Sequence, residues 1–271
     1  MNKEEHLNNW ILRQTECSIL QFDKSMATHY PESVAYLKNS EAFYKRIVEQ
    51  SNYLDAIQII NWNEYLQSDS TVLDLGGGVG WLSAYLSKYD SVKTIYNLDT
   101  SKFFLNEMMP EMIQLMSGRP EKIVPIEGLF YPLLFEDKSI DVVVASSSFH
   151  HADNLEKLLR EVGRILKDNG LLFILNETPY PYFKYTISII RVFLSIMRNT
   201  LIRKYESISP QLSSSGILYD PYLNDRAYPK WYWEKVIESS GLSIIESVNT
   251  GLPTLKNSSG IGLMHFVCKK I

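Results

Sequence analysis

Cysteine is nearly absent from this 271-residue sequence, which contains only Cys17 and Cys268. The two lie near opposite ends of the chain and form no C-x-x-C pair, which argues against a disulfide framework and against a cysteine-rich zinc site. The opening segment, MNKEEHLNNWILRQ, also lacks the apolar core of a secretory signal. These absences are typical of a reducing compartment, and we expect a cytoplasmic protein.

Long apolar runs are absent as well. The most hydrophobic stretch, residues 185–202, is short for a bilayer span and contains Arg191 and Arg198, so we expect no transmembrane segment. The favoured interpretation is a partly buried helix of a lid. An amphipathic helix that contacts a lipid-like substrate, a membrane surface or a partner subunit remains the alternative.

The sequence has no large excess of one charge. Its formal net charge of -4 argues against a dedicated nucleic-acid-binding protein. With 45% hydrophobic and 21% charged residues, the chain is expected to be globular with a substantial core. Its length fits one large domain or a domain with an added lid. We expect a small-molecule partner and no nucleic acid, and a homodimer is compatible with these properties.

One motif stands out, the run VLDLGGGVGW at residues 72–81. A short apolar strand containing Asp74 is followed by Gly76, Gly78 and Gly80, and then by an amphipathic segment. Glycine allows a tight turn and a close approach of the backbone to a ligand. The helix that follows points unpaired N–H groups and its positive dipole end at that ligand. Strand, glycine loop and helix predict a nucleotide-binding corner of an α/β sheet.

The spacing of these glycines differs from two other nucleotide motifs. The dinucleotide fingerprint G-x-G-x-x-G would need its third glycine at Trp81 or Ser83. No G-K-[ST] follows the glycines, so the lysine and the Mg²⁺-binding hydroxyl of phosphoryl transfer are lacking. No H-E-x-x-H motif or close His/Cys cluster indicates a catalytic metal, and none is expected.

From residue 72 onward, short β-branched or apolar runs alternate with helical patterns. The predicted strands are residues 72–75, 94–98, 123–126, 141–145, 171–175, 242–248 and 263–268. Alternation of this kind predicts an α/β fold, a Rossmann-like doubly wound and mostly parallel seven-stranded sheet with helices on both faces.

Two helices of this pattern have predictable boundaries. Leucine, valine and isoleucine recur at helical spacing from Leu155 to Leu166. Asp153 or Asn154 can cap the start of this helix, and Asn169–Gly170 can close its end. Residues 101–116 also have a helical pattern, which Pro110 is expected to kink or interrupt.

Asp99 ends the second predicted strand, 25 residues after Asp74. A carboxylate at that position can accept hydrogen bonds from both hydroxyls of a ribose. The alternative is that Asp99 only caps the next helix.

The D-x-G-x-G-x-G spacing resembles motif I of the class I S-adenosylmethionine-dependent methyltransferases. The stretch PLLFEDKSIDVVVASSSFHHADNLEKLLREVGRILKDNGLLFI is similar to the region of that family from before strand four through strand five. The resemblance covers residues 72–177 and implies S-adenosylmethionine as the cofactor. It says nothing about the methyl acceptor.

The resemblance implies roles for residues around this corner. Asp74 would help to hold the amino group of the cofactor, Asp99 its ribose, with Thr100 beside the adenine. Ser146 or Ser147, after strand four, would close over the methionine portion. The family often has an acid after strand three, and here that position is Leu129. The implied cofactor-binding set is Asp74, Gly76, Gly77, Gly78, Gly80, Asp99, Thr100, Leu129, Phe130, Ser146 and Ser147.

Adenine recognition has two interpretations because of that departure. A small shift in register could bring Glu127 into the place of the missing acid. Alternatively, the backbone of Leu129–Phe130 and packing alone hold the adenine.

His150 and His151 are the candidate catalytic residues. They follow the fourth strand, at the carboxyl edge where ligands bind in open α/β sheets. Histidine is well suited to remove a proton from an oxygen or nitrogen acceptor. The alternative is that both are polar loop residues or cap the next helix.

The candidate substrate contacts are mostly tyrosines, which offer an apolar wall with a polar tip. Glu177, just after strand five, could orient an acceptor or be a solvated acid. His29 and His265 are interpreted as structural. The candidate acceptor-contacting residues are Tyr30, Glu177, Tyr180, Tyr182, Tyr219, Tyr222 and Tyr228.

We predict four segments along the chain. Residues 1–66 form a helical N-terminal cap, and residues 67–177 the Rossmann-like core that binds S-adenosylmethionine. Residues 178–230, rich in proline and tyrosine, are an inserted lid that covers the substrate. Residues 231–271 complete the core sheet.

The leading hypothesis is a methyltransferase that acts on an oxygen or nitrogen of a small molecule. The N/D-P-P-Y/F motif of the adenine-N6 DNA methyltransferases is missing, since the chain reads ASSSFHH after strand four. The alternatives are a non-catalytic S-adenosylmethionine-binding module or subunit and, disfavoured by glycine spacing, an NAD-dependent oxidoreductase.

Overall fold

The computed structural model describes residue 28 and the ranges 37–202, 210–213, 216–220 and 225–271. Within these ranges a seven-stranded sheet runs through the centre, in the order β3-β2-β1-β4-β5-β9-β8. Its strands are β1 (Ser70–Leu75), β2 (Val92–Asp99), β3 (Ile123–Glu127), β4 (Ile140–Ser146), β5 (Leu166–Glu177), β8 (Leu242–Pro253) and β9 (Gly262–Lys270).

The direction of the strands follows from how they pair. β1 to β5 pair in parallel, whereas β9 is antiparallel to both β5 and β8. Valines 142 to 144 at the centre of β4 are buried, as expected for a strand covered on both faces. The predicted Rossmann-like, mostly parallel sheet is therefore confirmed, and β9 supplies the antiparallel member.

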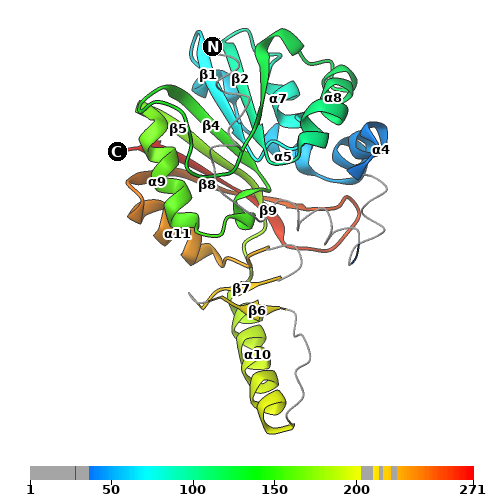
Figure 1. Ribbon diagram of the computed structural model, residues 1–271, viewed down its shortest axis with the longest axis vertical. Helices are drawn as coiled ribbons and strands as arrows, with labels where there is room; N and C mark the ends of the chain where they lie inside the picture. The colour runs from blue at the N-terminus through cyan, green and yellow to red at the C-terminus, as the bar shows by residue number, and fades with distance from the viewer. Residues whose placement is uncertain (1–27, 29–36, 203–209, 214–215, 221–224) are drawn as a thin grey trace.

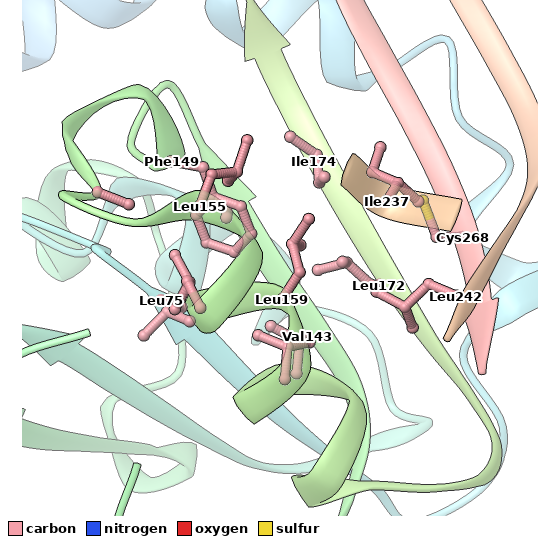
Figure 2. Close-up of a cluster of buried hydrophobic side chains, with 14 of the residues drawn as sticks. Leu75, Val143, Phe149, Leu155, Leu159, Leu172, Ile174, Ile237, Leu242 and Cys268 are labelled. Carbon is pink, nitrogen blue, oxygen red and sulfur yellow. The ribbon is translucent and has the colours of Figure 1, made fainter. Parts of the chain in front are cut away.

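Helices cover both faces of this sheet (Figure 1). On one face, α9 (Leu155–Ile165) and α11 (Lys230–Ser239) pack their apolar side chains on the strands. Figure 2 shows Leu155 and Leu159 of α9 lying over Leu75 and Val143, with Ile237 of α11 near Cys268. The core on this face therefore joins elements that are far apart in sequence.

The opposite face is covered by helices that precede and follow the glycine loop. They are α4 (Ser40–Lys45), the π-helix η1 (Arg46–Gln50), α5 (Tyr53–Ile57), α6 (Trp62–Tyr65), α7 (Trp81–Leu86), the π-helix η2 (Phe104–Met108) and α8 (Met109–Leu115). The remaining short helices are 3-10 turns, η3 (Pro120–Lys122) and η4 (Phe149–His151). The helical pattern predicted before the glycine loop is thus present over residues 40–65.

Two predicted helix boundaries can be compared with the structure. Pro110 lies in the first turn of α8, so the helical stretch divides next to it, as predicted. Asn154 is the N-cap of α9 and accepts a hydrogen bond from the Lys157 N–H at 2.9 Å. The predicted end at Asn169–Gly170 is wrong, because α9 ends at Ile165 and Asn169, with φ 66°, turns within the start of β5.

The segment after β5 projects away from the sheet (Figure 1). It contains α10 (Tyr182–Ile202) and the hairpin of β6 (Gln211–Leu212) and β7 (Leu218–Tyr219). A small separate cluster of Tyr185, Val192 and Leu218 holds α10 to this hairpin. In the described residues, no helix is long and apolar enough to cross a membrane.

Leu159 tests the core. It lies in α9 and is fully buried, so Leu159→Ala leaves a cavity and is expected to lower the free energy of unfolding by about 2–5 kcal/mol. Leu194→Ala is the matched control, because Leu194 is 58% exposed and its truncation should cost less than about 0.5 kcal/mol. Urea denaturation measures both, and equal effects would contradict the described packing.

Candidate functional site

The glycine loop between β1 and α7 is a turn that only glycine can form. Gly76, Gly78 and Gly80 have φ of 74°, 52° and 76°, the left-handed region that disfavours side chains. A Cβ on Gly76 would lie 2.7 Å from the Cβ of Ser148. At Gly78, by contrast, the nearest atom to such a Cβ would be the Asp99 Oδ2 at 4.0 Å. The turn is therefore closed at Gly76 and open at Gly78.

Three buried polar side chains next to the turn are linked to one another by hydrogen bonds. Asp74 is 1% exposed, and its Oδ2 accepts a hydrogen bond from the Ser83 hydroxyl at 2.7 Å. The Asn97 amide donates to the same hydroxyl at 3.0 Å. Burial raises the pKa of Asp74 to about 7. The other carboxylate oxygen, Oδ1, is buried and has no hydrogen-bond partner among the described residues.

Asp99 faces the turn from the end of β2. Its Oδ2 accepts a hydrogen bond from the Gly78 N–H at 2.9 Å, and its Oδ1 accepts one from the Ser101 N–H at 2.8 Å. Burial raises the pKa of this carboxyl, against the lowering effect of these backbone N–H groups and of nearby His151. An acidic side chain thus lies beside the open part of the glycine loop.

The loop after β3 forms another wall. Glu127 is in register with Asp99 on the neighbouring strand, and the Gly128 N–H donates to the Asp99 carbonyl at 3.0 Å. The Phe130 ring carbon Cε1 would lie 3.1 Å from a Cβ on Gly76. The predicted adenine-binding positions Thr100, Leu129 and Phe130 are half-buried in these loops. Their role, and that of Glu127, remains a prediction.

Three serines follow one another at the end of β4. Ser146 accepts a hydrogen bond from the Asn176 amide at 2.9 Å, and the Ser147 hydroxyl lies 3.1 Å from that of Tyr53 in α5. Ser148, which sequence reasoning missed, donates to the Leu75 carbonyl at 2.9 Å and packs against Gly76. The strand ends at Ser146, two residues before Ser148, and no local signal distinguishes the third serine from the other two.

His150 is paired with a buried carboxylate. The His150 Nδ1 lies 2.8 Å from the Glu177 Oε2, and Glu177, only 2% exposed, also accepts the Phe149 N–H through Oε1 at 3.2 Å. Burial alone would lower the pKa of His150, but Glu177 and then Asp225 outweigh it, so the pKa is raised. Glu177 thus holds the histidine, a contact that the sequence did not predict.

His151 meets a carboxylate from a distant part of the chain. Its Nδ1 lies 2.7 Å from the Asp225 Oδ1, and the His150 Nε2 is 3.9 Å from the same oxygen. The Arg226 N–H donates to the His150 carbonyl at 3.0 Å and fixes this loop in place. Sequence reasoning missed Asp225, because nothing in its local sequence indicates that it would meet the histidines.

The two histidines and Asp225 could also hold a cation. One ligand-type atom from each lies within 4.8 Å of the others, and the two imidazole rings are 4.3 Å apart. Burial tends to raise the pKa of Asp225, but the histidines outweigh it and hold that pKa below its usual value. Ion pairing between the histidines and Asp225 is enough to explain the contacts among these three residues, so the contacts by themselves do not indicate a bound cation.

The predicted tyrosines do not converge on one site. Tyr180 and Tyr219 contact Ser188 and Gln211 inside the projecting segment, at 3.4 and 2.9 Å, while Tyr182 is 72% exposed. Tyr228 is 3% exposed and stacks on Tyr232. Tyr30, Tyr222 and His29 lie outside the described residues. A role of these tyrosines in acceptor binding remains a prediction.

His265 is structural, as expected. It is fully buried, its Nδ1 accepts the Asn176 N–H at 3.1 Å, and its Nε2 lies 3.0 Å from the Ala56 carbonyl. Burial lowers its pKa, which suits a neutral ring with one donor and one acceptor nitrogen.

Comparison with known proteins places this site in a family context. Residues 73–174 match the model of the methyltransferase domain family. Over 115 residues the chain is 34% identical to a sarcosine/dimethylglycine N-methyltransferase of Aphanothece halophytica, covering 42% of this chain and 38% of that protein. Over 130 residues it is 29% identical to a sterol 24-C-methyltransferase of Neurospora crassa, covering 48% and 32% of the two chains.

The fold extends further than the sequence similarity. A SAM-dependent methyltransferase from Aquifex aeolicus superposes with a TM-score of 0.55 at 17% identity, over 89% of this chain and 98% of that one. This chain spans well under half the length of the two relatives that it matches in sequence. The range that matches the family model, residues 73–174, contains the glycine loop.

The His150–Glu177 pair makes stability depend on pH. The folded-state pKa of His150 is raised above the ordinary histidine value of 6.5. The pair therefore stabilises the fold fully below that pH, and this stabilisation is lost as pH rises through the folded-state pKa. Removal of the Glu177 charge in Glu177→Gln should therefore cost most stability near about pH 6 and progressively less toward about pH 9.

Urea denaturation of both proteins across this pH range measures the difference in the free energy of unfolding. Glu238→Gln, at an exposed glutamate, is the control and should give a small difference at every pH. A cost of Glu177→Gln that stays constant or grows with pH would contradict the pairing.

Proposed function

We propose that this protein, whose residues 73–174 form a class I S-adenosylmethionine-dependent methyltransferase domain, transfers a methyl group to an oxygen or nitrogen atom of a small molecule. The observation that supports this most is the Asp99 carboxylate hydrogen-bonded to the open glycine loop at Gly78. The candidate catalytic residues His150 and His151 lie inside the matched domain, whereas the acceptor side of the site is expected to lie partly outside it.

The residues around the glycine loop suit the cofactor chemically. Asp99 would accept hydrogen bonds from the ribose hydroxyls, because its carboxylate has lone pairs beyond those used by Gly78 and Ser101. The buried Asp74 Oδ1 has no partner in the described residues and suits a donor such as the cofactor amino group. Space at Gly78 leaves the backbone accessible to a ligand.

The other predicted contacts surround these two acids. Thr100 and the Leu129–Phe130 segment would flank the adenine, and Ser146 and Ser147 would lie on the methionine side. Because Phe130 and Ser148 both pack against Gly76, this end of the loop is shaped by side chains. We infer that it forms a wall of the cofactor site.

S-adenosylmethionine, when bound, supplies an electrophilic methyl group on its sulfonium sulfur. This chain would orient the acceptor, exclude water and take up a proton where the acceptor must lose one. His150 and His151 are the groups suited to that proton, since they follow β4 at the carboxyl edge of the sheet.

The carboxylates that hold the histidines support this role. Glu177 at 2.8 Å from Nδ1 fixes the orientation of the His150 ring and stabilises its protonated form, and Asp225 does the same for His151. A histidine paired in this way becomes a better proton acceptor at its other nitrogen. The buried Glu177 therefore serves the reaction as a positioning residue.

The acceptor is expected to lie outside the matched domain. The two relatives are named for methylation of a nitrogen and of a carbon, so the shared cofactor half leaves the acceptor atom open. In this chain, Asp225 and Arg226 from the segment after β7 meet the histidines. We infer that residues 178–230 provide the acceptor side of the site.

Asp99 tests cofactor binding. Asp99→Ala removes hydrogen bonds to the ribose that contribute roughly 1.5–3 kcal/mol, so affinity for S-adenosylmethionine and S-adenosylhomocysteine should fall about tenfold or more. Asp168→Ala, at an exposed aspartate, is the matched control and should bind as wild type. Isothermal titration calorimetry measures all three proteins, and unchanged affinity of Asp99→Ala would reject the assigned site.

The histidine pair tests catalysis. The full chain is incubated with methyl-labelled S-adenosylmethionine and fractions of a metabolite extract, and the labelled fraction becomes the substrate. His150→Gln should lower kcat about 100-fold or more, because a general base contributes that much, with cofactor affinity unchanged. Glu177→Gln should give a smaller loss, and the double variant should be no slower than His150→Gln alone.

Two results would contradict the proposal at different points. Full activity of both His150→Gln and His151→Gln would remove the proton-accepting role but leave methyl transfer. No labelling of any fraction despite tight cofactor binding would favour a non-catalytic S-adenosylmethionine-binding subunit.

A further inference from the structure

Helix α10 exposes an unusual amount of apolar surface for a helix outside the core. Seven large hydrophobic side chains on it are more than a third exposed, against six in the rest of the described residues. They are Tyr182, Phe183, Ile190, Phe193, Leu194, Ile196 and Met197, with exposed fractions from 47% to 75%. Concentration of exposed hydrophobic residues on one element indicates a binding surface.

Some of these side chains lie opposite the buried side of the helix, and the others lie closer to it. Tyr185 and Val192, seven residues apart, face the β6–β7 hairpin and are buried. Residues seven apart on a helix lie within about 20° of one another. Phe183, Ile190 and Met197 therefore share one line along α10, roughly half a turn from the buried pair.

A cationic stripe runs beside this apolar line. Lys184, Arg191 and Arg198 are also seven residues apart and all three are exposed. The sequence of α10 contains no aspartate or glutamate. The exposed surface of this helix is thus apolar along one line and positively charged along its flank.

We propose that α10 docks the protein on an anionic membrane surface, with Phe183, Ile190 and Leu194 in the interface and the three cations at the lipid headgroups. A helix with an apolar side and a cationic flank lies in the plane of the membrane–water interface. It binds there through burial of its apolar side chains and attraction of its cations to anionic lipid. Long basic side chains reach the headgroups while their stems cover apolar surface. The projection of α10 from the sheet leaves it accessible (Figure 1).

The positive charge of α10 favours an anionic membrane, rather than a second copy of the chain, as the partner of its exposed face. Two α10 helices packed through this face would bring their cationic stripes side by side with no acid in either helix to neutralise them. An anionic bilayer neutralises the same charges. A spanning orientation is also disfavoured, because Lys184, Arg191 and Arg198 recur along the whole helix.

Vesicle flotation of the full chain tests the docking. The wild-type protein should float with mixed phosphatidylcholine–phosphatidylglycerol vesicles at low salt, and markedly less with pure phosphatidylcholine vesicles or at high salt. The apolar variant F183Q/I190Q/L194Q and the charge variant K184Q/R191Q/R198Q should each bind at least about tenfold more weakly. Glutamine preserves helix propensity in both.

The control variant K88Q/K93Q/K235Q removes three exposed lysines elsewhere and should bind vesicles within about threefold of wild type, because attraction acts near the docked surface. S-adenosylhomocysteine affinity should be unchanged in all three variants, which shows that they are folded and separates this test from that of methyl transfer. Absence of wild-type binding to anionic vesicles, or equal binding of the α10 variants, would overturn the proposal. So would an oligomer that F183Q/I190Q/L194Q dissociates, since that result assigns the face to a second copy.

Discussion

The hydrogen bond from the Gly78 N–H to the Asp99 carboxylate is the contact on which the candidate site depends. It joins the loop after β1 to the end of β2, two neighbouring strands in parallel register. The left-handed backbone at Gly78 turns this N–H toward the carboxylate and leaves the surrounding space open. A side chain at Gly78 would strain the loop and fill that space. Glycine is therefore needed at this position both for the turn and for the access of a ligand.

Three buried or half-buried acids line the same edge of the sheet, and a different kind of hydrogen-bond donor stabilises each carboxylate. Asp74 relies on a serine hydroxyl, Asp99 on backbone N–H groups and Glu177 on the ring of His150. The cost of burying a carboxylate is met in each case by donors aimed at it. The Oδ1 atom of Asp74 is the exception among the carboxylate oxygens of these three acids, because it is buried without a hydrogen-bond donor in the described residues.

Helices α9 and α10 show how similar patterns lead to different outcomes. Both have apolar residues at helical spacing, but α9 lies on the sheet and buries Leu155, Leu158 and Leu159. Among the described residues, α10 packs mainly against the small β6–β7 hairpin. Its remaining apolar side chains do not lie on the described sheet, and seven large ones are exposed. Burial of an amphipathic helix is decided by the partner surface that the topology provides, not by its own pattern.

Local sequence determined the strands, the glycine turn and the position of Asp99, because each depends on residues next to one another in the chain and on the fixed geometry of parallel strands. The N-cap at Asn154 and the helix break at Pro110 were also predictable, since both act within one turn. The end of α9 was not, because continuation into β5 is set by pairing with β4. Only the tertiary structure brought Asp225 to His151, Glu177 to His150 and Ser148 to Gly76, since such contacts depend on how distant segments pack and leave no periodic signal in the chain.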